Sequence, residues 1–237
     1  MNKRLLSALL LFCSVTTFAQ SNAKKSSIFI GLGPSIPIGE FGAKDASDEK
    51  NGLATTGFYF DLGYQFQFSK NVGAIAIFKW KTHGIAKEAL KYAIPDGSGG
   101  SLSINAGSWK MASVLGGITQ TFALSKSENF KIEFREAAGV QFTSTPELDV
   151  NYNIPGVGSS SAKQESQSAT SFAYLLGVGF KYQLNSTLGL RLYGDFNNSN
   201  ANFKAFTVNS NGTTLTVPSS KQKTGNIDVG LGLTIGL

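Results

Sequence analysis

Beyond the first twenty or so residues, apolar and polar positions alternate with a period of two, which predicts β-strands. The clearest run is Ile227–Leu237, where branched aliphatic residues alternate with Asp228, Thr234 and glycines. A face of small residues suits a crowded interior, and a face of large aliphatic residues suits lipid. The same alternation predicts seven further strands, at Ile28–Gly33, Phe58–Phe68, Val72–Lys81, Ser108–Leu124, Phe130–Arg135, Ser171–Leu184 and Leu188–Asp195.

The connections between these strands alternate in length. Short turns are expected at Ser69–Asn71, Ser125–Asn129 and Asn185–Thr187, and long polar stretches at Pro37–Leu53, Thr82–Ala106, Thr145–Ser168 and Asn198–Thr224. This order predicts an all-β fold: an eight-stranded antiparallel up-and-down transmembrane β-barrel with short periplasmic turns and long extracellular loops. Each long stretch is rich in Gly, Ser, Asn and Lys, and Ile85–Tyr92 in the second is compatible with a short helix ended by Pro95.

Aromatic residues gather beside the predicted short turns. Amphipathic rings prefer the interface between membrane and water, so this clustering predicts an aromatic girdle at the periplasmic end of the barrel. The residues concerned are Phe66, Phe68, Phe122, Phe130, Phe180 and Tyr182.

The N-terminus has the composition of a secretory signal. Lys3 and Arg4 precede the apolar segment Leu5–Phe12, and Thr17 and Ala19 place small residues where a signal peptidase requires them. We expect a signal peptide at 1–19 and a barrel domain at 20–237, exported to the bacterial outer membrane. The apolar segment is too short to cross a bilayer as a helix.

Cysteine content and charge exclude several kinds of protein. The single cysteine, Cys13, lies in the signal, and the bulky Phe12 before it argues against a lipoprotein. The exported chain therefore has neither a disulfide nor a thiolate metal ligand. Without Lys3 and Arg4, the 21 basic residues become 19 against 15 acidic ones, a net charge of +4. This charge is too small to indicate nucleic acid as a partner. Because the chain is expected to be exported to the outer membrane, the expected partner is the lipid of that membrane.

Charged residues on the inward face predict a lumen network. An eight-stranded barrel has an interior just wide enough for side chains to fill, which favours an interlocked polar plug over an anion-selective pore. The residues expected in this network are Asp61, Lys79, Lys81, Lys131, Glu133, Arg135, Lys181, Arg191, Asp195 and Asp228.

Glu136 does not fit the alternation, because strict pairing would direct its carboxylate at lipid. A β-bulge at Arg135–Ala137 would turn it inward, and this is the favoured interpretation. A site for a lipid head group or a partner protein is the alternative.

No catalytic, cofactor or metal site is expected. His83 is the only histidine, and we interpret it as a surface residue at the root of a loop. A hydrolase acting on lipid or protein would pair it with a serine and an acid, but nothing in the sequence marks such partners. Asp45, Asp48 and Glu49 lack the spacing of a calcium loop and are interpreted as a solvated group.

The signal end Phe18-Ala19-Gln20, the strand Ile28–Pro34 and the segment Pro37–Phe41 resemble the small outer-membrane barrels of Bacteroidota. These are described as porin-family or PorT-family β-barrels and are similar in architecture to OmpA and OmpX barrels. Many such barrels end in an aromatic residue, where this chain has Leu237. The resemblance implies an eight-stranded outer-membrane barrel. Its fold serves many functions.

Four functions are therefore considered. The favoured one is a non-enzymatic protein of envelope structure or adhesion, whose exterior loops contact envelope proteins or extracellular ligands. The alternatives are an accessory barrel of a secretion system, as the PorT resemblance implies, a narrow channel, and a lipid-active enzyme. The main structural rival is a soluble exported barrel of lipocalin type, which would have its apolar face inside, around a ligand.

Overall fold

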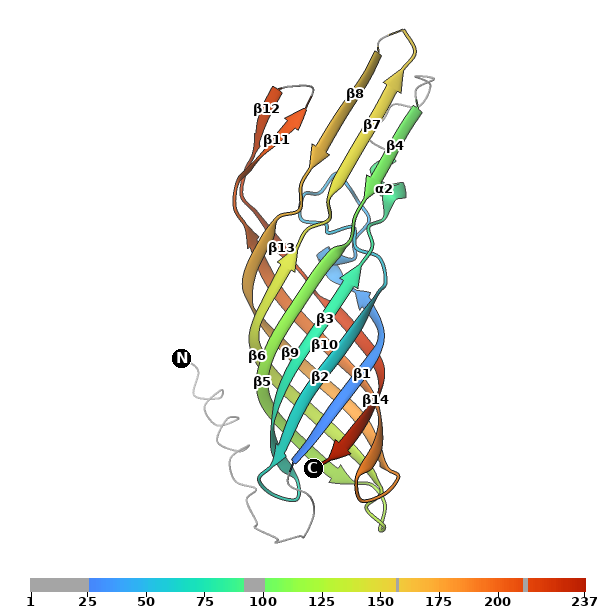
Figure 1. Ribbon diagram of the computed structural model, residues 1–237, viewed down its shortest axis with the longest axis vertical. Helices are drawn as coiled ribbons and strands as arrows, with labels where there is room; N and C mark the ends of the chain where they lie inside the picture. The colour runs from blue at the N-terminus through green and yellow to red at the C-terminus, as the bar shows by residue number, and fades with distance from the viewer. Residues whose placement is uncertain (1–25, 92–100, 157, 211–212) are drawn as a thin grey trace.

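The chain forms a closed antiparallel β-barrel of eight strands (Figure 1). The structure is a computed structural model that describes residues 26–91, 101–156, 158–210 and 213–237. Around the barrel the order is β14, β1, β2, β3, β5, β6, β9 and β10, and β10 pairs with β14 to close the ring. The barrel strands are β1 (Ser26–Pro37), β2 (Gly57–Gln67), β3 (Val72–His83), β5 (Trp109–Ala123), β6 (Phe130–Ser144), β9 (Ser168–Gln183), β10 (Leu188–Phe203) and β14 (Asn226–Gly236).

Side chains alternate between lumen and exterior along each barrel strand. In β14, Asp228 is fully buried in the lumen, whereas Leu231 on the outer face is 65% exposed. The outer face of the barrel is made almost entirely of large apolar side chains, and the inner face carries the buried charges. An apolar exterior around a polar interior is the arrangement of a barrel that spans the bacterial outer membrane.

The short turns lie together at one end of the barrel, which is the periplasmic end. The predicted aromatic girdle lies here, because all six of its residues are exposed on the outer face beside these turns. Within it Phe130 stacks on Phe180 with ring centroids 5.7 Å apart, and Phe66 contacts Phe68 edge to face. The predicted eight-stranded topology, with short turns at one end, is confirmed.

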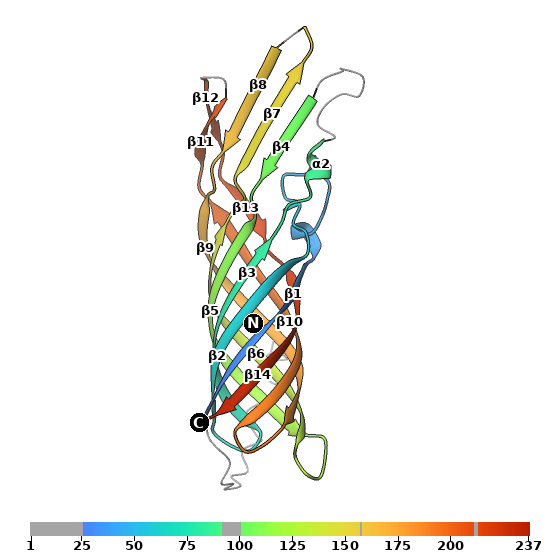
Figure 2. The same ribbon diagram turned by 45° about the vertical axis from the view of Figure 1, so that its right-hand side comes forward.

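The long exterior stretches contain strands that the sequence alternation did not predict. Three of the long stretches continue into a second antiparallel sheet of order β12, β11, β8, β7 and β4, which rises above the extracellular end of the barrel (Figures 1 and 2). Its strands are β4 (Ser101–Ala106), β7 (Leu148–Ile154), β8 (Gly158–Gln164), β11 (Phe206–Ser210) and β12 (Thr213–Val217). The short strand β13 (Ser220–Lys223) extends the pairing of β10 below this sheet.

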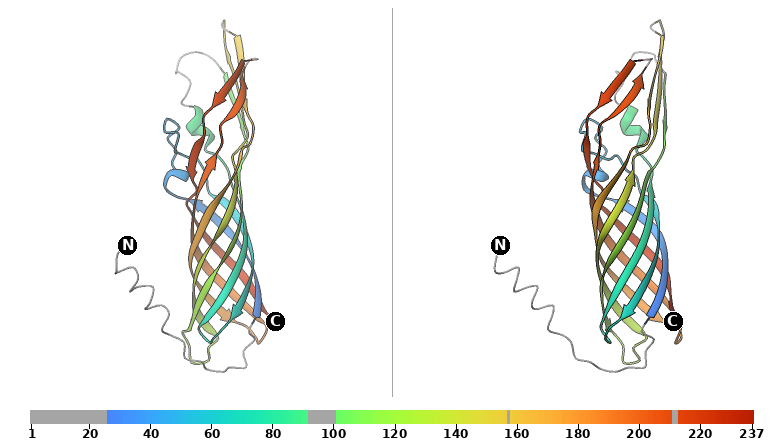
Figure 3. Two further views of the ribbon diagram at one scale, coloured as in Figure 1. Left: turned by 90° about the vertical axis from the view of Figure 1, so that its left-hand side faces the viewer. Right: turned by 60° about the vertical axis from the view of Figure 1, so that its left-hand side comes forward.

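The high serine, asparagine and glycine content of these stretches concealed their alternation. In β7, for example, Leu148 and Val150 alternate with Asp149 and Asn151. Side views of the molecule show the exterior strands as a continuation of one side of the barrel wall (Figure 3). Each strand therefore gains a neighbour for its backbone hydrogen bonds, which favours extended chain over an irregular loop.

In the part of the chain that the structure describes, helical structure is limited to two short segments. The 3-10 helix η1 (Gly39–Phe41) begins the first exterior stretch, and α2 (Lys87–Lys91) lies within the segment where a short helix was expected. Among the described residues, no helix is both long and apolar enough to cross a membrane. The predicted signal peptide at 1–19 and Pro95 lie outside the described residues.

Candidate functional site

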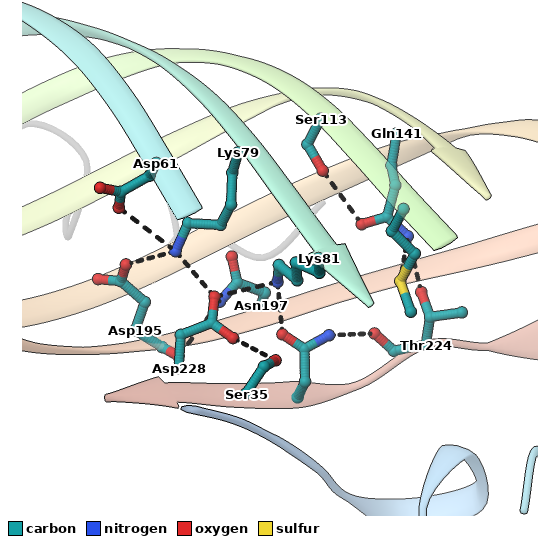
Figure 4. A network of polar contacts seen from close by, with 12 residues as sticks. Ser35, Asp61, Lys79, Lys81, Ser113, Gln141, Asp195, Asn197, Thr224 and Asp228 are labelled. Atoms are coloured by element: carbon teal, nitrogen blue, oxygen red, sulfur yellow. Dashed lines mark hydrogen bonds and ion pairs between the residues drawn. The ribbon is translucent and has the colours of Figure 1, made fainter. Parts of the chain in front are cut away.

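The upper half of the lumen, toward the extracellular end, is organised around the ammonium group of Lys79. Its Nζ lies 2.8 Å from Asp195 Oδ2, 2.8 Å from Asp228 Oδ2 and 3.8 Å from Asp61 Oδ2 (Figure 4). The four side chains come from β2, β3, β10 and β14 and are fully buried. One cation therefore holds together three acids that would otherwise repel one another in a medium of low dielectric constant.

Lys81 lies one pleat above Lys79 and shares Asp228 with it. Lys81 Nζ is 3.1 Å from Asp228 Oδ2 and donates a hydrogen bond of 2.5 Å to Asn226 Oδ1. Ser35 Oγ donates to Asp228 Oδ1 at 2.5 Å, and Asn197 Nδ2 donates to Asp228 Oδ2 at 3.0 Å. Both oxygens of the buried Asp228 carboxylate are thus occupied by donors, which is the condition for keeping a charge inside a barrel.

The lower half of the lumen is organised around the carboxylate of Glu133. Glu133 forms ion pairs with Lys181 and Arg191, from β9 and β10. Gln65 joins this group, since its Nε2 donates to Glu133 Oε2 at 3.2 Å and its Oε1 accepts from Lys181 Nζ at 2.8 Å. The lower cluster thus has one acid between two cations, the inverse of the arrangement around Lys79.

Arg135 and two aromatic rings fill the space between the two clusters. Arg135 Nη2 donates to Asp195 Oδ1 at 2.6 Å, and its guanidinium lies 4.2 Å from the ring centroid of Tyr193. The guanidinium of Arg191 lies 4.1 Å from the ring centroid of Phe29. Tyr193 donates to Asp61 Oδ1 at 2.9 Å, so the ring also belongs to the upper cluster. The lumen is therefore packed with side chains along its length.

All but one of the residues predicted for the lumen network lie in these two clusters or, like Arg135, between them. The exception is Lys131, which is half-exposed at the periplasmic end of β6 and forms no ion pair within the described residues. It pairs in register with Lys181, whose charge is already directed at Glu133. Lys131 therefore stands outside both clusters.

The sequence interpretation missed the uncharged members of the network. Selecting charged residues alone left out the amides, hydroxyls and rings that complete each cluster, although they occupy the same inward positions. Selecting every polar side chain at an inward-facing position of the alternation, whether charged or not, would have identified them. They are Ser35, Tyr59, Gln65, Gln141, Tyr193, Asn197, Thr224 and Asn226.

The first exterior stretch, residues 38–54, closes the extracellular mouth of the lumen and is called the cap. Phe41 is fully buried and contacts Trp109 edge to face, with ring centroids 5.5 Å apart. Trp109 Nε1 donates to the carbonyl of Gly52 at 3.0 Å, and Lys44 donates to the carbonyl of Ala54. Burial lowers the pKa of Lys44. The cap therefore covers the polar clusters with an apolar layer.

The interpretation of His83 as a surface residue is wrong, because the cap buries it completely. Its ring lies against Phe41 with centroids 5.2 Å apart, and Nδ1 is 3.1 Å from the carbonyl oxygen of Thr55. Strand β3 carries His83 inward at the mouth of the lumen, where the cap folds over it. A residue at the root of one loop is buried when a neighbouring loop folds over the mouth of the barrel, as the cap does here.

His83, Ser35 and Asp228 lie together, yet they do not form a catalytic triad. Ser35 Oγ donates to Asp228 and is 3.3 Å from His83 Nε2, while His83 Nδ1 faces a backbone carbonyl in place of a carboxylate. A triad requires the acid to orient the imidazole and the imidazole to accept the serine proton. All three residues are also buried beneath the cap. The arrangement serves to anchor the mouth of the lumen.

The acids of the cap are solvated, as expected. Asp45 accepts hydrogen bonds from the backbone and hydroxyl of Ser47, which hold the pKa of its carboxyl below the ordinary value. Asp48 accepts from the backbone of Lys50 at 3.0 Å. In the described part of the chain, no group of three or more acids, histidines or cysteines is placed to hold a metal ion.

The predicted β-bulge at Arg135–Ala137 is wrong. Pairing is unbroken on both sides of β6, where Glu136 faces Ile118 of β5 and Leu176 of β9. Glu136 is exposed on the outer face, between the buried Arg135 and Ala137. A bulge would have reversed every side chain above it, placing Phe142 in the lumen and Thr143 in lipid, so regular pairing is favoured.

No protein-family model matches the chain, and no curated protein matches it. Solved structures do resemble it. Ail, the attachment invasion locus protein of Yersinia pestis, is 17% identical, with a TM-score of 0.44 over 90% of this chain and 99% of that one. Neisserial surface protein A is 9% identical, with a TM-score of 0.46 over 92% and 100% of the two chains. Outer membrane protein OprG of Pseudomonas aeruginosa is 12% identical, with a TM-score of 0.45 over 91% and 98%.

Proposed function

We propose that this protein is a non-enzymatic outer-membrane barrel that contacts envelope proteins or extracellular ligands through its exterior sheet. The observation that carries this proposal is the sheet itself, built by three separate exterior stretches. A barrel that only had to cross the membrane would be complete with short connections at both ends. Ordered structure outside the membrane supports a role in envelope structure or adhesion.

The exterior sheet is open at both sides. Within the described residues, β12 pairs only with β11, and β4 pairs only with β7. The peptide groups on the outer edge of each strand are therefore available to another extended chain. Exposed small polar side chains, such as Ser103, Asn151 and Ser159, add hydrogen-bonding groups between the edges.

The packed lumen argues for contact and against transport. Two ion-pair clusters, the rings of Phe29 and Tyr193, and the cap lie in series between the two ends of the barrel. Moving an ion through would require breaking buried charge pairs, which are strongly stabilised once formed. We therefore propose that the lumen network is a structural plug and not an anion-selective pore.

The contact role is tested by shortening the exterior sheet while the barrel is kept. Residues 206–217, which contain β11 and β12, are replaced by a short Asn-Gly turn, and proteoliposomes are added to surfaces coated with whole bacterial cells or extracellular-matrix protein. We expect the intact protein to adhere and the shortened one to lose most adhesion. Equal adhesion of both, with heat-modifiable gel mobility showing a folded barrel, would reject the proposal.

Two alternatives have their own measurements. A narrow channel predicts steady ohmic currents when the purified protein is placed in planar bilayers, whereas a plug predicts none. An accessory role in secretion predicts a stoichiometric partner after purification from native membranes. That second role rests on the family resemblance, and the exterior sheet supports the contact role directly.

A further inference from the structure

Glu136 places a carboxylate on the lipid-facing surface at the middle of the membrane. It lies six residues from Phe130 at the periplasmic girdle and six from Phe142 at the extracellular end of β6. Both phenylalanines are exposed on the same outer face. Half the hydrocarbon thickness is about 15 Å, which is beyond the reach of a glutamate side chain. The carboxylate therefore cannot be solvated from either side.

The surface beside Glu136 is lined by small residues. The row above it runs across three strands as Ala76, Gly116 and Ala138, which are direct partners in the pairing of β3, β5 and β6. A side chain built on Gly116 would meet nothing within 4 Å, so the surface is open there. Most other outward positions carry large aliphatic or aromatic residues, and the remaining small ones, such as Ala74, Ala112 and Gly194, are less exposed. A patch of small residues, with the acid Glu136 at its edge, thus interrupts the large apolar side chains of the outer face.

We propose that this patch, Ala76, Gly116, Ala138 and Glu136, binds the membrane-spanning surface of a second protein that presents a basic or amide side chain at mid-depth. Small residues allow backbones to approach closely within a membrane, where van der Waals packing and polar contacts drive association. Ionisable residues inside a membrane are unfavourable and pair with a partner group. Glu136 lacks a hydrogen-bond or ion-pair partner among the described residues of its own chain.

Charge complementarity favours a second protein over two other occupants, a lipid head group and another copy of this chain. Lipid head groups carry cations and donors, but they lie at the surfaces and not at mid-depth. A second copy of this chain would have to be related by an axis along the membrane normal, so it would present its own mid-depth belt. Within the described residues that belt contains no outward-facing lysine or arginine, and its outward amide Asn198 already donates to Tyr174 Oη at 3.1 Å. A second copy would also bring another Glu136 near the first. A different protein supplies the missing donor.

The experiment places a photo-cross-linking residue at Ala138 of the full chain in native membranes. The matched control carries it at Leu231, which faces lipid at the middle of β14 on the far side of the barrel. We expect a discrete protein adduct from position 138 and none from position 231. Cross-linked peptides identify the partner, and we expect replacement of its mid-depth basic or amide residue by leucine to remove the adduct.

Dependence on the acid is tested with Glu136→Leu and, as a control, Leu176→Ala on the neighbouring strand. Glu136→Leu is expected to lower the adduct at least tenfold, and Leu176→Ala to leave it. In pure lipid vesicles Glu136→Leu is expected to raise the folded-to-unfolded ratio roughly tenfold, because a polar group leaves hydrocarbon. This second measurement shows that the variant folds.

Three outcomes would overturn the proposal. The first is an adduct of lipid alone at position 138. The second is an adduct between two copies of this chain. The third is a protein adduct that persists in the Glu136→Leu variant, because packing without the carboxylate would then suffice.

Discussion

Lys79 and Asp228 meet across the lumen with 2.8 Å between Nζ and Oδ2, although 149 positions separate them in the chain. Lys79 lies on β3 and Asp228 on the closing strand β14, with β1 and β2 between them around the barrel. The ion pair therefore connects β14 to β3, a strand with which β14 has no backbone pairing. This buried contact links the closing strand to β3 in addition to the hydrogen bonds that close the ring.

Replacing Lys79 by methionine is expected to lower the free energy of unfolding by about 3–5 kcal/mol. The change leaves three buried carboxylates without their shared cation, which is more unfavourable than removing both members of a pair. Urea unfolding of the barrel in lipid vesicles measures the difference. Lys126→Met, in a periplasmic turn, is the control, and equal stability of the two variants would contradict the assigned role of Lys79.

Glu133 and Arg191 are expected to be energetically coupled. Glu133→Gln and Arg191→Met should each destabilise the barrel, while the double variant should be less destabilised than their sum by about 1–3 kcal/mol, because contacting residues are non-additive. Unfolding of the four proteins completes the cycle. Additive effects would show that the two side chains stabilise the lumen independently.

Phe41→Ala is expected to loosen the cap. Removing a buried phenylalanine typically lowers stability by about 3–5 kcal/mol, and here the loss falls on the cap, whose remaining contacts are mainly hydrogen bonds. Trypsin should then cleave after Lys44 or Lys50 faster than in the parent protein when membranes are digested. Ala46→Ser, an exposed change in the same segment that removes no contact, should leave the cleavage rate unaltered. No difference between these variants would argue against a closed cap.

Gly31→Ala and Gly116→Ala form a matched pair of glycine substitutions. A Cβ at Gly31 would overlap the hydroxyl of Tyr193 and crowd Asp61 Oδ1, which breaks their hydrogen bond. At Gly116 it would meet no atom within 4 Å. We expect lowered stability for Gly31→Ala and unchanged stability for Gly116→Ala in isolated vesicles. Comparable losses would mean that the lumen tolerates movement of Tyr193.

The turn contact between Lys70 and Glu128 is expected to contribute a small, pH-dependent stability. The Lys70 ammonium holds the pKa of Glu128 below its ordinary value of 4.5. A carboxyl with a lowered pKa in the folded state stabilises it above the unfolded pKa, and the contribution is lost as pH falls through the folded one. The difference in urea midpoint between the parent and Glu128→Gln should therefore vanish in acid. A constant difference would mean that charge is not its origin.

The period of two was sufficient to predict the barrel from sequence. Each strand must place one face against lipid and the other in the lumen, so Leu231 and Asp228 could be assigned to opposite faces without coordinates. The alternation of short and long connections then determined the topology. Even the lumen charges followed, because parity alone directs Lys79, Glu133 and Arg191 inward.

Contacts between distant segments could not be read in the same way. Three features depend on how strands pair in space. They are the cap over His83, the exterior sheet, and the choice of Asp228 as partner for both Lys79 and Lys81. Glu136 shows this most clearly. A local rule favoured a bulge that would bury the charge, whereas pairing with β5 and β9 fixed the register of the whole strand and left the carboxylate outside. Faces follow from local alternation, but partners follow only from the closed barrel.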